Sequence, residues 1–256
     1  MEGKKTAIVT GASSGIGREI SHILSEKGYS VILVARSVGR LREITRELSG
    51  ESDIYACDLS RRAEVLALSE YIKEIKPDVV VNNAGFGLFG DVAEASPERL
   101  AEMIDVNVTA VTLLTAASLT VMKEQEKGRV LNVASSAGLL PGGPHMAVYY
   151  ATKSYVVSLT GAAAQELSEA GSKVTVSALC PGPVDTDFNR VAGVRFALKG
   201  IDARRCAEAG VEGMLTGKTF IVPELRIRAA AFGTRLLPRK TVIRLVSGQQ
   251  RKKDKG

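Results

Sequence analysis

Two side chains in the second half of the chain are spaced so that they could transfer a proton. Tyr149 and Lys153 are four residues apart in Tyr-Tyr-Ala-Thr-Lys, so on a helix they project from the same face. An ammonium group beside a phenol favours the phenolate and lowers its pKa. Moving a tyrosine from its usual pKa near 10 to about 7 requires roughly 4 kcal/mol. The pair predicts a tyrosine acid–base catalyst tuned by a lysine.

A glycine-rich segment near the N-terminus could bind a pyrophosphate. Thr10–Gly17 reads TGASSGIG, and it follows a strand-like run and leads into a helix-forming segment. Glycines allow a tight turn and a close approach of backbone N–H groups to phosphate, while the helix N-terminus adds positive potential. The spacing G-x-x-x-G-x-G differs from the commoner G-x-G-x-x-G, and a glycine-rich turn without a ligand is the alternative.

The end of the second strand-like run indicates which dinucleotide the chain prefers. An NAD enzyme of this architecture carries an acid about twenty residues after the glycines, which binds the ribose hydroxyls. Here the run ends in Arg36-Ser37, Arg40 follows one turn later, and no acid lies between Val31 and Arg42. An arginine suits a 2′-phosphate, with which a charge-assisted hydrogen bond contributes about 1.5–3 kcal/mol. We therefore expect NADP(H) to be preferred over NAD(H); a solvated arginine is the alternative.

The third strand-like run ends in Cys57-Asp58-Leu59. The Asp58 carboxylate could accept a hydrogen bond from the exocyclic amine of adenine, or it could cap the helix that starts near Arg61. The residues alone leave both roles open.

Strand-like runs alternate with helix-forming segments along the chain. The runs are near-continuous in apolar residues, as in strands covered on both faces, and Ser96-Pro97 is a typical helix start. The predicted strands are Thr6–Thr10, Ser30–Ala35, Asp53–Cys57, Asp78–Asn82, Arg129–Ala134, Lys173–Leu179 and a weaker Thr219–Val222. The predicted helices are Gly15–Lys27, Val38–Leu48, Arg61–Ile75, Pro97–Lys127 and Met146–Ala170.

This alternation predicts an α/β fold, a doubly wound parallel sheet of about seven strands flanked by helices. Such a sheet binds its ligand outside the carboxyl ends of the strands, where the strand order reverses. Without internal repeats or a linker-like tract, we expect a single Rossmann-fold domain over residues 1–256.

Composition limits the class of protein further. A hydrophobic content of 45% and a charged content of 24% are ordinary for a globular protein. The three cysteines are widely spaced and there are two histidines, so we expect no disulfide framework and no metal. Thr6 leaves no room for a signal peptide, and the apolar stretch around Ala110–Met122 is too short to span a bilayer. These features predict a cytoplasmic protein.

Positive charge is concentrated at the C-terminus. Residues 225–256 hold ten Lys/Arg and one acid, a balance of +9, whereas the rest holds 24 basic and 27 acidic residues, a balance of −3. Apolar residues lie among the arginines of Leu225–Val246. One hypothesis for this basic C-terminal tail is weak, peripheral contact with an anionic membrane surface; a solvated, partly disordered end or a subunit contact is the alternative. With few aromatic residues interleaved, nucleic acid is not expected as a partner.

The chain resembles the short-chain dehydrogenase/reductase family, in particular bacterial-type carbonyl or 3-oxoacyl reductases. The matching elements occur in order: TGASSGIG, NNAG at Asn82–Gly85, Asn107, Ser135, Tyr149 with Lys153, and PGPVDT at Pro181–Thr186. The resemblance extends from about Lys5 to Asp187, and the residues beyond are only loosely matched. It implies an NADP(H)-dependent oxidoreductase that reduces a carbonyl to an alcohol, or the reverse.

The resemblance also implies a role for each catalytic residue. Ser135 would hold the substrate oxygen, and Tyr149 would transfer the proton. Lys153 would bind the nicotinamide ribose and, together with the positively charged ring of the oxidised nicotinamide, lower the pKa of the tyrosine. Asn107 would anchor a water-mediated proton path, with a buried asparagine satisfied by helix backbone as the alternative. Ser136 competes with Ser135, and Tyr150, off the family pattern, is assigned to packing or the pocket wall.

The cofactor cleft is predicted to involve the glycine-rich turn, the ends of the second and third strands, NNAG and PGPVDT. In the family, Pro181-Gly182 shape the wall beside the nicotinamide, Thr186 holds its carboxamide, and Asn82 lines the cleft with Gly85. The predicted cofactor-binding residues are Gly11, Ser13, Ser14, Gly15, Ile16, Gly17, Arg36, Ser37, Arg40, Asp58, Leu59, Asn83, Ala84, Gly85, Tyr149, Lys153, Pro181, Gly182, Val184 and Thr186.

The substrate is expected to be a small apolar ketone, aldehyde or 3-oxoacyl compound. Residues 188–224, with Phe188, Val191, Val194, Phe196, Leu198 and Ile201, correspond to the family's substrate-covering segment, opposite Leu139 and Leu140. His145 lies between Ser135 and Tyr149 in sequence and could touch the substrate, or be solvated or structural.

Two further expectations concern the whole chain. The long helices Pro97–Lys127 and Met146–Ala170 resemble those through which relatives pair, which predicts a homodimer or homotetramer. A non-catalytic NADP-binding regulator and a membrane-peripheral scaffold on the same fold are the alternative functions.

Overall fold

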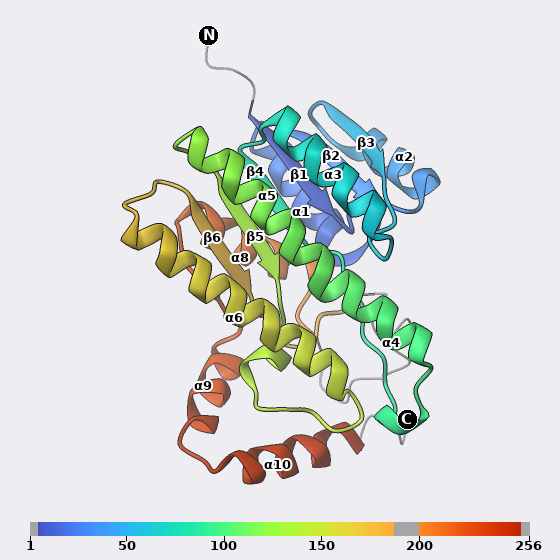
Figure 1. Cartoon of the computed structure of the whole chain (residues 1–256), viewed down its shortest axis with the longest axis vertical. Coiled ribbons are helices and arrows are strands. Elements are labelled where there is room, and N and C mark those ends of the chain that lie inside the picture. The colour runs from blue at the N-terminus through green and yellow to red at the C-terminus, as the bar shows by residue number, and fades with distance from the viewer. Residues whose placement is uncertain (1–4, 187–199, 252–256) are drawn as a thin grey trace.

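The computed structural model describes residues 5–186 and 200–251, which contain a seven-stranded parallel sheet (Figure 1). The strands lie in the order β3-β2-β1-β4-β5-β6-β7. The predicted doubly wound α/β sheet is confirmed, and the predicted strand bounds agree to within one or two residues. The strands are β1 Thr6–Thr10, β2 Ser30–Ala35, β3 Ser52–Ala56, β4 Val79–Asn82, β5 Arg129–Val133, β6 Thr175–Leu179 and β7 Phe220–Ile221.

The strand order of the parallel sheet reverses between β1 and β4. Val9 of β1 pairs with Leu33 of β2 on one side and with Val81 of β4 on the other. The connections therefore leave in opposite directions from these two neighbouring strands, and a crevice opens at their carboxyl ends. This crevice is where the sequence motifs meet.

Helices cover both faces of the sheet because successive strand residues point to opposite faces. Ala7 and Val9 pack in one buried cluster with the helices on their side, and Ile8 packs in a second cluster on the other side. The first face is covered by α1 Gly15–Glu26, α2 Val38–Glu47 and α8 Ala203–Leu215, and the second by α3 Arg62–Ile75, α5 Val111–Glu124 and α6 Ala147–Glu169.

The long helix predicted from Pro97 consists of α4 Pro97–Ile104, a π-helical turn at Asp105–Ala110, and α5. Ser96 caps it as predicted, with its Oγ accepting a hydrogen bond from Arg99 N at 3.3 Å. Pro97–Glu124 is 28 residues long with a mean hydropathy of 1.5, sufficient by length and composition to cross a membrane. The sequence analysis had considered only the shorter apolar stretch Ala110–Met122 within this helix. In this fold the helix covers the sheet between α3 and α6.

Residues 200–224 do not form a cover over the substrate side. Ile201 bridges to Val184, α8 packs along α1, and β7 extends the sheet. The other predicted cover residues, Phe188, Val191, Val194, Phe196 and Leu198, lie outside the described residues. Apolar positions that resembled a cover therefore belong partly to the sheet-packing core.

The basic C-terminal segment is mostly helical over residues 225–251, and residues 252–256 lie outside the described residues. It forms α9 Leu225–Thr234 and α10 Arg239–Arg251, which lie together at one end of the molecule, below the carboxyl ends of the strands (Figure 1). Val242, Val246 and Gln250 are spaced four residues apart and are buried. The two valines belong to the same buried cluster as Tyr149 and Tyr150, so α10 is anchored beside the proposed catalytic residues.

Candidate active site

A cleft of about 780 Å³ lies at the carboxyl ends of the central strands. Its walls include the glycine-rich turn after β1, the segments after β4 and β5, the start of α6, and residues of α9 and α10. Most predicted cofactor-binding residues line this one cleft. The exceptions among them are Gly15, which lines a shallow neighbouring depression, together with Gly17 and Thr186.

The glycine-rich turn is held against the end of β4. Thr10 Oγ1 accepts hydrogen bonds from the backbone N–H groups of Asn83 at 2.9 Å and Ala84 at 3.1 Å, while Asn83 Nδ2 donates to the Gly11 carbonyl at 3.2 Å. A Cβ atom on Gly11 would lie 2.8 Å from Ala84 Cα, and one on Gly17 would collide with Asn83. Glycine is therefore required for packing at both positions, as well as for backbone access.

This turn fits a pyrophosphate group. Gly11 and Gly15 have φ angles of +63° and +55°, which favour glycine, and both belong to the turn that leads into α1. Ser14 precedes the helix with an extended backbone and makes no side-chain capping bond, so its side chain does not occupy the first N–H groups of α1. Ser13, Ser14 and Ile16 line the cleft at this point.

Arg36 and Arg40 lie where the sequence predicted recognition of a 2′-phosphate. Both line the cleft beside Ser37, Asp58 and Leu59. Arg36 is largely exposed, and its Nη1 lies 3.6 Å from Glu102 Oε1. Glu102 of α4 also lines the cleft, and sequence spacing did not indicate that this acid would face the arginine. Arg36 is thus oriented by a weak ion pair.

Asp58 takes part in a local turn and also lines the cleft. Its Oδ1 accepts hydrogen bonds from Ser60 N at 3.1 Å and Ser60 Oγ at 2.8 Å. Burial raises the pKa of Asp58, but the Ser60 hydrogen bonds and the charges of Arg36 and Arg61 outweigh it, and the net pKa is lowered. The carboxylate therefore stabilises the turn before α3, while remaining within the cleft wall beside the proposed adenine site.

Ser135 and Tyr149 are brought together at the base of the cleft. Their side chains are hydrogen-bonded, and Ser135 Oγ also accepts from Ala137 N at 3.1 Å. Ser136 lines the cleft too, but Ser135 is the residue that meets the phenol. Tyr150 OH accepts a hydrogen bond from Gln250 Nε2 at 2.7 Å, which places this second phenol in the pocket wall, as expected from the resemblance.

Lys153 is buried behind Tyr149. Its Nζ donates to the Val133 carbonyl at 2.8 Å and lies 6.0 Å from the centroid of the Tyr149 ring. Burial lowers the pKa of Lys153 to about 8. Burial raises the pKa of Tyr149 to about 12, and the Ser135 hydrogen bond offsets only part of that effect. The protein without cofactor therefore raises the pKa of the tyrosine, whereas the lowered pKa was predicted for Lys153 acting together with an oxidised nicotinamide ring.

Asn107 is buried in the π-helical turn and joins two segments of the site. Its Oδ1 accepts from Phe86 N at 3.1 Å, and its Nδ2 donates to Phe86 O at 2.8 Å and to Thr152 Oγ1 at 3.1 Å. A Cβ atom on Gly85 would lie 2.9 Å from Asn107 Oδ1 and 3.2 Å from Lys153 Nζ. Asn107, Gly85 and Lys153 thus converge, and the asparagine is satisfied by a loop and by Thr152 rather than by its own helix.

The segment after β6 forms a further part of the cleft wall. Pro181, Gly182 and Val184 line it, and Gly182 N donates to Glu224 Oε2 at 3.0 Å. Thr186 lies against the glycine-rich turn, because its Cγ2 would be 3.1 Å from a Cβ on Gly15. The turn after β1 and the segment after β6 therefore approach each other across the crevice.

Asn82 differs from the position expected for it, whereas for His145 the sequence had left a substrate contact and a solvated or structural role open. Asn82 does not line the cleft: it is buried, and its Nδ2 donates to Asn132 Oδ1 at 2.8 Å and Thr115 Oγ1 at 3.1 Å. His145 also lies outside the cleft lining, with Nδ1 at 2.6 Å from Asp91 Oδ1. These contacts support structural roles, in a core polar network and in a loop.

Several lining residues were missed because they belong to the segment interpreted as a tail. Ile227, Ala230 and Ala231 of α9 and Gln249 and Gln250 of α10 line the cleft. Ile227, Ala230 and Ala231 follow helical spacings of three and four residues, and this periodicity was the signal that could have identified the lining residues of α9.

Comparison with known proteins establishes the family. The pattern of the short chain dehydrogenases matches residues 5–193, and the chain therefore belongs to that family of nicotinamide-dependent oxidoreductases. It is 34% identical over 230 residues to an uncharacterized oxidoreductase of Staphylococcus epidermidis, covering 88% of this chain and 97% of that protein.

Two solved structures are closely similar in fold. A short-chain dehydrogenase from Sphingobium yanoikuyae in complex with NADPH has a TM-score of 0.82 at 28% identity, covering 91% of this chain and 94% of that chain. A short chain dehydrogenase/reductase from Burkholderia phymatum in complex with NAD has a TM-score of 0.81 at 28% identity, covering 90% and 92%. The similar folds thus hold either dinucleotide.

Proposed function

We propose that the protein is an NADP(H)-dependent carbonyl reductase, or the reverse alcohol dehydrogenase, acting on an apolar ketone, aldehyde or 3-oxoacyl substrate. The observation that carries this proposal is the hydrogen-bonded Ser135–Tyr149 pair, with buried Lys153 behind it, in the same cleft as the glycine-rich turn. A non-catalytic NADP-binding regulator would have no need of a proton donor at this position.

In the proposed reaction, the bound nicotinamide supplies the hydride. The Ser135 and Tyr149 hydroxyls share one hydrogen bond and would both bind the substrate oxygen, with Tyr149 transferring the proton to it as the alcohol forms. Lys153, whose pKa is about 8, is mainly protonated at neutral pH. Its positive charge opposes the effect of burial on the Tyr149 phenol. Because that effect is large, we expect efficient proton transfer only in the cofactor complex.

The preference for NADP(H) is supported by the two arginines at the end of β2. Arg36 and Arg40 line the cleft beside the proposed ribose site. Neither position is occupied by an acidic residue, which would repel a 2′-phosphate. Glu102 opposes this preference in part, because it lies beside Arg36. One arginine–phosphate bond would favour NADPH about ten- to a hundredfold.

An apolar substrate is supported by the wall opposite the glycine-rich turn. Phe86, Leu140, Met146 and Ile227 line this part of the cleft. Tyr150 and Gln250 provide polar groups there, but they are hydrogen-bonded to each other. The wall therefore favours a hydrophobic body attached to the reacting carbonyl.

The test is NADPH oxidation with a panel of ketones, aldehydes and 3-oxoacyl thioesters. Tyr149→Phe is expected to lower kcat/KM by about a hundred- to ten-thousandfold, because it removes the proton donor, while NADPH binding is retained. Tyr150→Phe is the matched control: it removes a neighbouring hydroxyl and one hydrogen bond, and should cost about tenfold or less.

The same assay separates the alternatives. A higher kcat/KM with NADH than with NADPH would contradict the cofactor preference. Tight NADPH binding without turnover of any compound would support the regulator, and equal losses in the two phenylalanine variants would remove Tyr149 from its proposed role.

A further inference from the structure

The outer surface of α9 and α10 combines exposed apolar side chains with positive charge. Leu225 and Leu236 are each 77% exposed and Phe232 is 65% exposed, and Leu237 and Leu245 are exposed as well. Large apolar side chains scattered singly on a surface are ordinary, but a group of them marks an interaction site. We call this group and the basic residues between its members the docking face, which also includes Arg226, Arg228, Arg235, Lys240 and Arg244.

Helical periodicity separates the docking face from the cleft. Leu225, Arg228, Phe232 and Arg235 follow spacings of three and four residues, so they lie along one side of α9 and its C-terminal end. The cleft is lined from a different side of the same helix, by residues that include Ile227. One side of α9 thus belongs to the docking face, and a different side lines the cleft.

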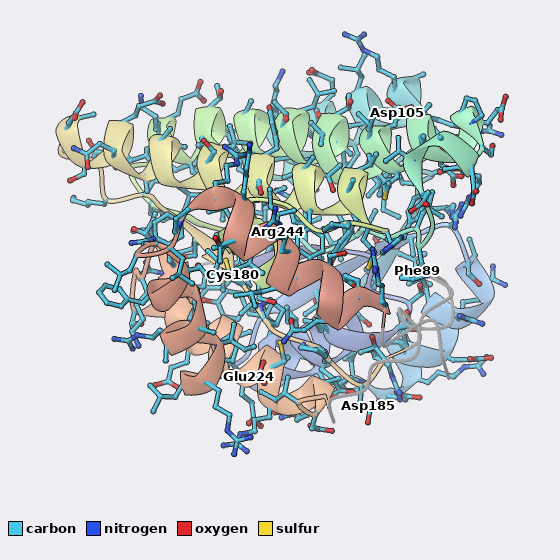
Figure 2. All side chains as sticks on the ribbon, turned by 90° about the horizontal axis from the view of Figure 1, so that it is seen from below. Phe89, Asp105, Cys180, Asp185, Glu224 and Arg244 are labelled. Atoms are coloured by element: carbon cyan, nitrogen blue, oxygen red, sulfur yellow. The ribbon has the colours of Figure 1, made fainter. Side chains whose placement is uncertain are left out.

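The same separation holds for α10. Val242 and Val246 face the core, whereas Lys240, Arg244 and Leu245 are exposed. Figure 2 looks onto α10 from below, with Arg244 labelled on it, and shows the helix lying across this end of the molecule. The outer sides of α9, α10 and the turn between them therefore belong to one end of the protein.

The charge of this end has a single sign. Residues 225–251 contain seven Lys/Arg and no acid. Within the described parts of the chain, none of the seven forms an ion pair, and Arg239 alone among them makes a side-chain hydrogen bond, to the Pro141 carbonyl at 3.2 Å. Among the described residues, this positive charge is therefore not balanced by acidic partners.

We propose that the docking face binds an anionic lipid bilayer. Basic side chains are attracted to anionic headgroups, and leucine and phenylalanine side chains insert at the boundary between headgroups and acyl chains. A second copy of the chain fits less well, because a two-fold interface would bring identical positive surfaces together. Nucleic acid offers no site for five exposed large apolar side chains.

Docking would connect the bilayer to the cleft. The helices whose outer sides form the docking face also line the substrate end of the cleft with Ile227, Ala230, Ala231 and Gln250. An apolar substrate dissolved in the lipid would then need to pass only these helices. The inference goes beyond the proposed function and does not depend on it, because membrane binding is measured without substrate.

The test is co-sedimentation of the full chain with two kinds of vesicle, phosphatidylcholine alone and phosphatidylcholine mixed equally with phosphatidylglycerol. Binding is expected only to the anionic vesicles and to weaken as salt is added. The variant Arg228→Glu/Arg235→Glu should lower the partition coefficient about tenfold or more. Leu236→Ser/Leu237→Ser should lower it as well, and should do so at high salt too.

Two controls make the result specific to this face. Lys123→Glu/Lys218→Glu makes the same charge change on exposed residues of other elements, and Leu66→Ser removes an exposed leucine of α3. Both should bind like the unchanged protein. Equal binding to the two kinds of vesicle, equal loss in test and control variants, or no vesicle binding at all would each overturn the proposal. Binding to an acidic protein in place of vesicles would do the same.

Discussion

At the residue scale, the site contains an ammonium group that is costly to bury. Lys153 is held between β5 and α6, with the Val133 carbonyl as its hydrogen-bond acceptor, and burial lowers its pKa from 10.5 to about 8. A lowered lysine pKa means that folding disfavours the charged form. The penalty is complete below pH 8 and is relieved as the pH rises from about 8 to about 10.5.

We therefore predict that Lys153→Met stabilises the protein at pH 7 while removing its activity. Removal of the buried charge should raise the free energy of unfolding by about 1–3 kcal/mol, after allowance for the lost hydrogen bond to Val133. The gain should diminish near pH 10. Urea unfolding at the two pH values measures it, with exposed Lys123→Met as the control, expected within about 0.5 kcal/mol of the unchanged protein. A less stable Lys153→Met at pH 7 would contradict this account.

The sequence identified these residues but not their environment. The spacing of Tyr149 and Lys153 was sufficient to place both in the site, since four residues on a helix define a common face. The direction of the Tyr149 pKa shift was not predictable, because it depends on burial by segments distant in sequence, including α10. Neither was the choice between Ser135 and Ser136: it follows from the extended backbone of Ser135 before a short 3-10 turn.

At the element scale, α10 forms part of the wall of the cleft, through Gln249 and Gln250. Val246 is 6% exposed and packs in the cluster that contains Tyr149 and Tyr150, whereas its neighbour Leu245 is 59% exposed. Two adjacent residues of similar chemistry thus offer a direct comparison between the inner and outer sides of one helix.

We predict that Val246→Asp raises KM for the carbonyl substrate about tenfold or more, because a carboxylate cannot stay in this apolar cluster and α10 must move away. Leu245→Asp should change KM less than about twofold with a water-soluble substrate. NADPH affinity, measured by fluorescence titration, should be unchanged in both variants, since α10 lies outside the glycine-rich turn. Similar KM values for the two variants would show that α10 does not shape the site.

The positions of helices and strands were predictable where a single sequence pattern, such as an apolar run, determined them. The central strands are continuous apolar runs bounded by turns, so their positions could be assigned closely. The π-helical turn that carries Asn107 was not predictable, because helical periodicity before and after it continues without a visible break. Helices α9 and α10 were not predicted, because the segment was interpreted from its many arginines as a basic tail. The apolar positions between the arginines were not assigned to a packing surface.

At the scale of the whole molecule, α5 and α6 present an outer surface suited to self-association. Thr112 Oγ1 and Tyr155 OH lie 2.9 Å apart and connect the two helices. Tyr155 is 40% exposed, and Ala116 of α5 and Ala151 of α6 are exposed as well. Small side chains around an exposed tyrosine allow two such surfaces to approach closely.

We therefore predict a dimer or tetramer, with a mass in solution twice or four times that of the 27.2 kDa chain. Ala151→Glu/Tyr155→Glu should reduce this mass, because like charges would face each other across a two-fold interface. Size-exclusion chromatography with light scattering measures it, and Leu66→Glu on α3 is the control. A single-chain mass for the unchanged protein would contradict the prediction.

The order of these parts along the chain has a consequence for how such a protein can diversify. The residues proposed for proton transfer and dinucleotide binding all precede position 187, whereas the inner sides of α9 and α10, which line the proposed substrate end of the cleft, begin at residue 225. Substitutions confined to residues 225–251 would therefore change the part of the cleft wall that α9 and α10 form, and would leave the glycine-rich turn, Ser135 and Tyr149 unchanged. Substrate range could then change while the proposed catalytic residues stay the same.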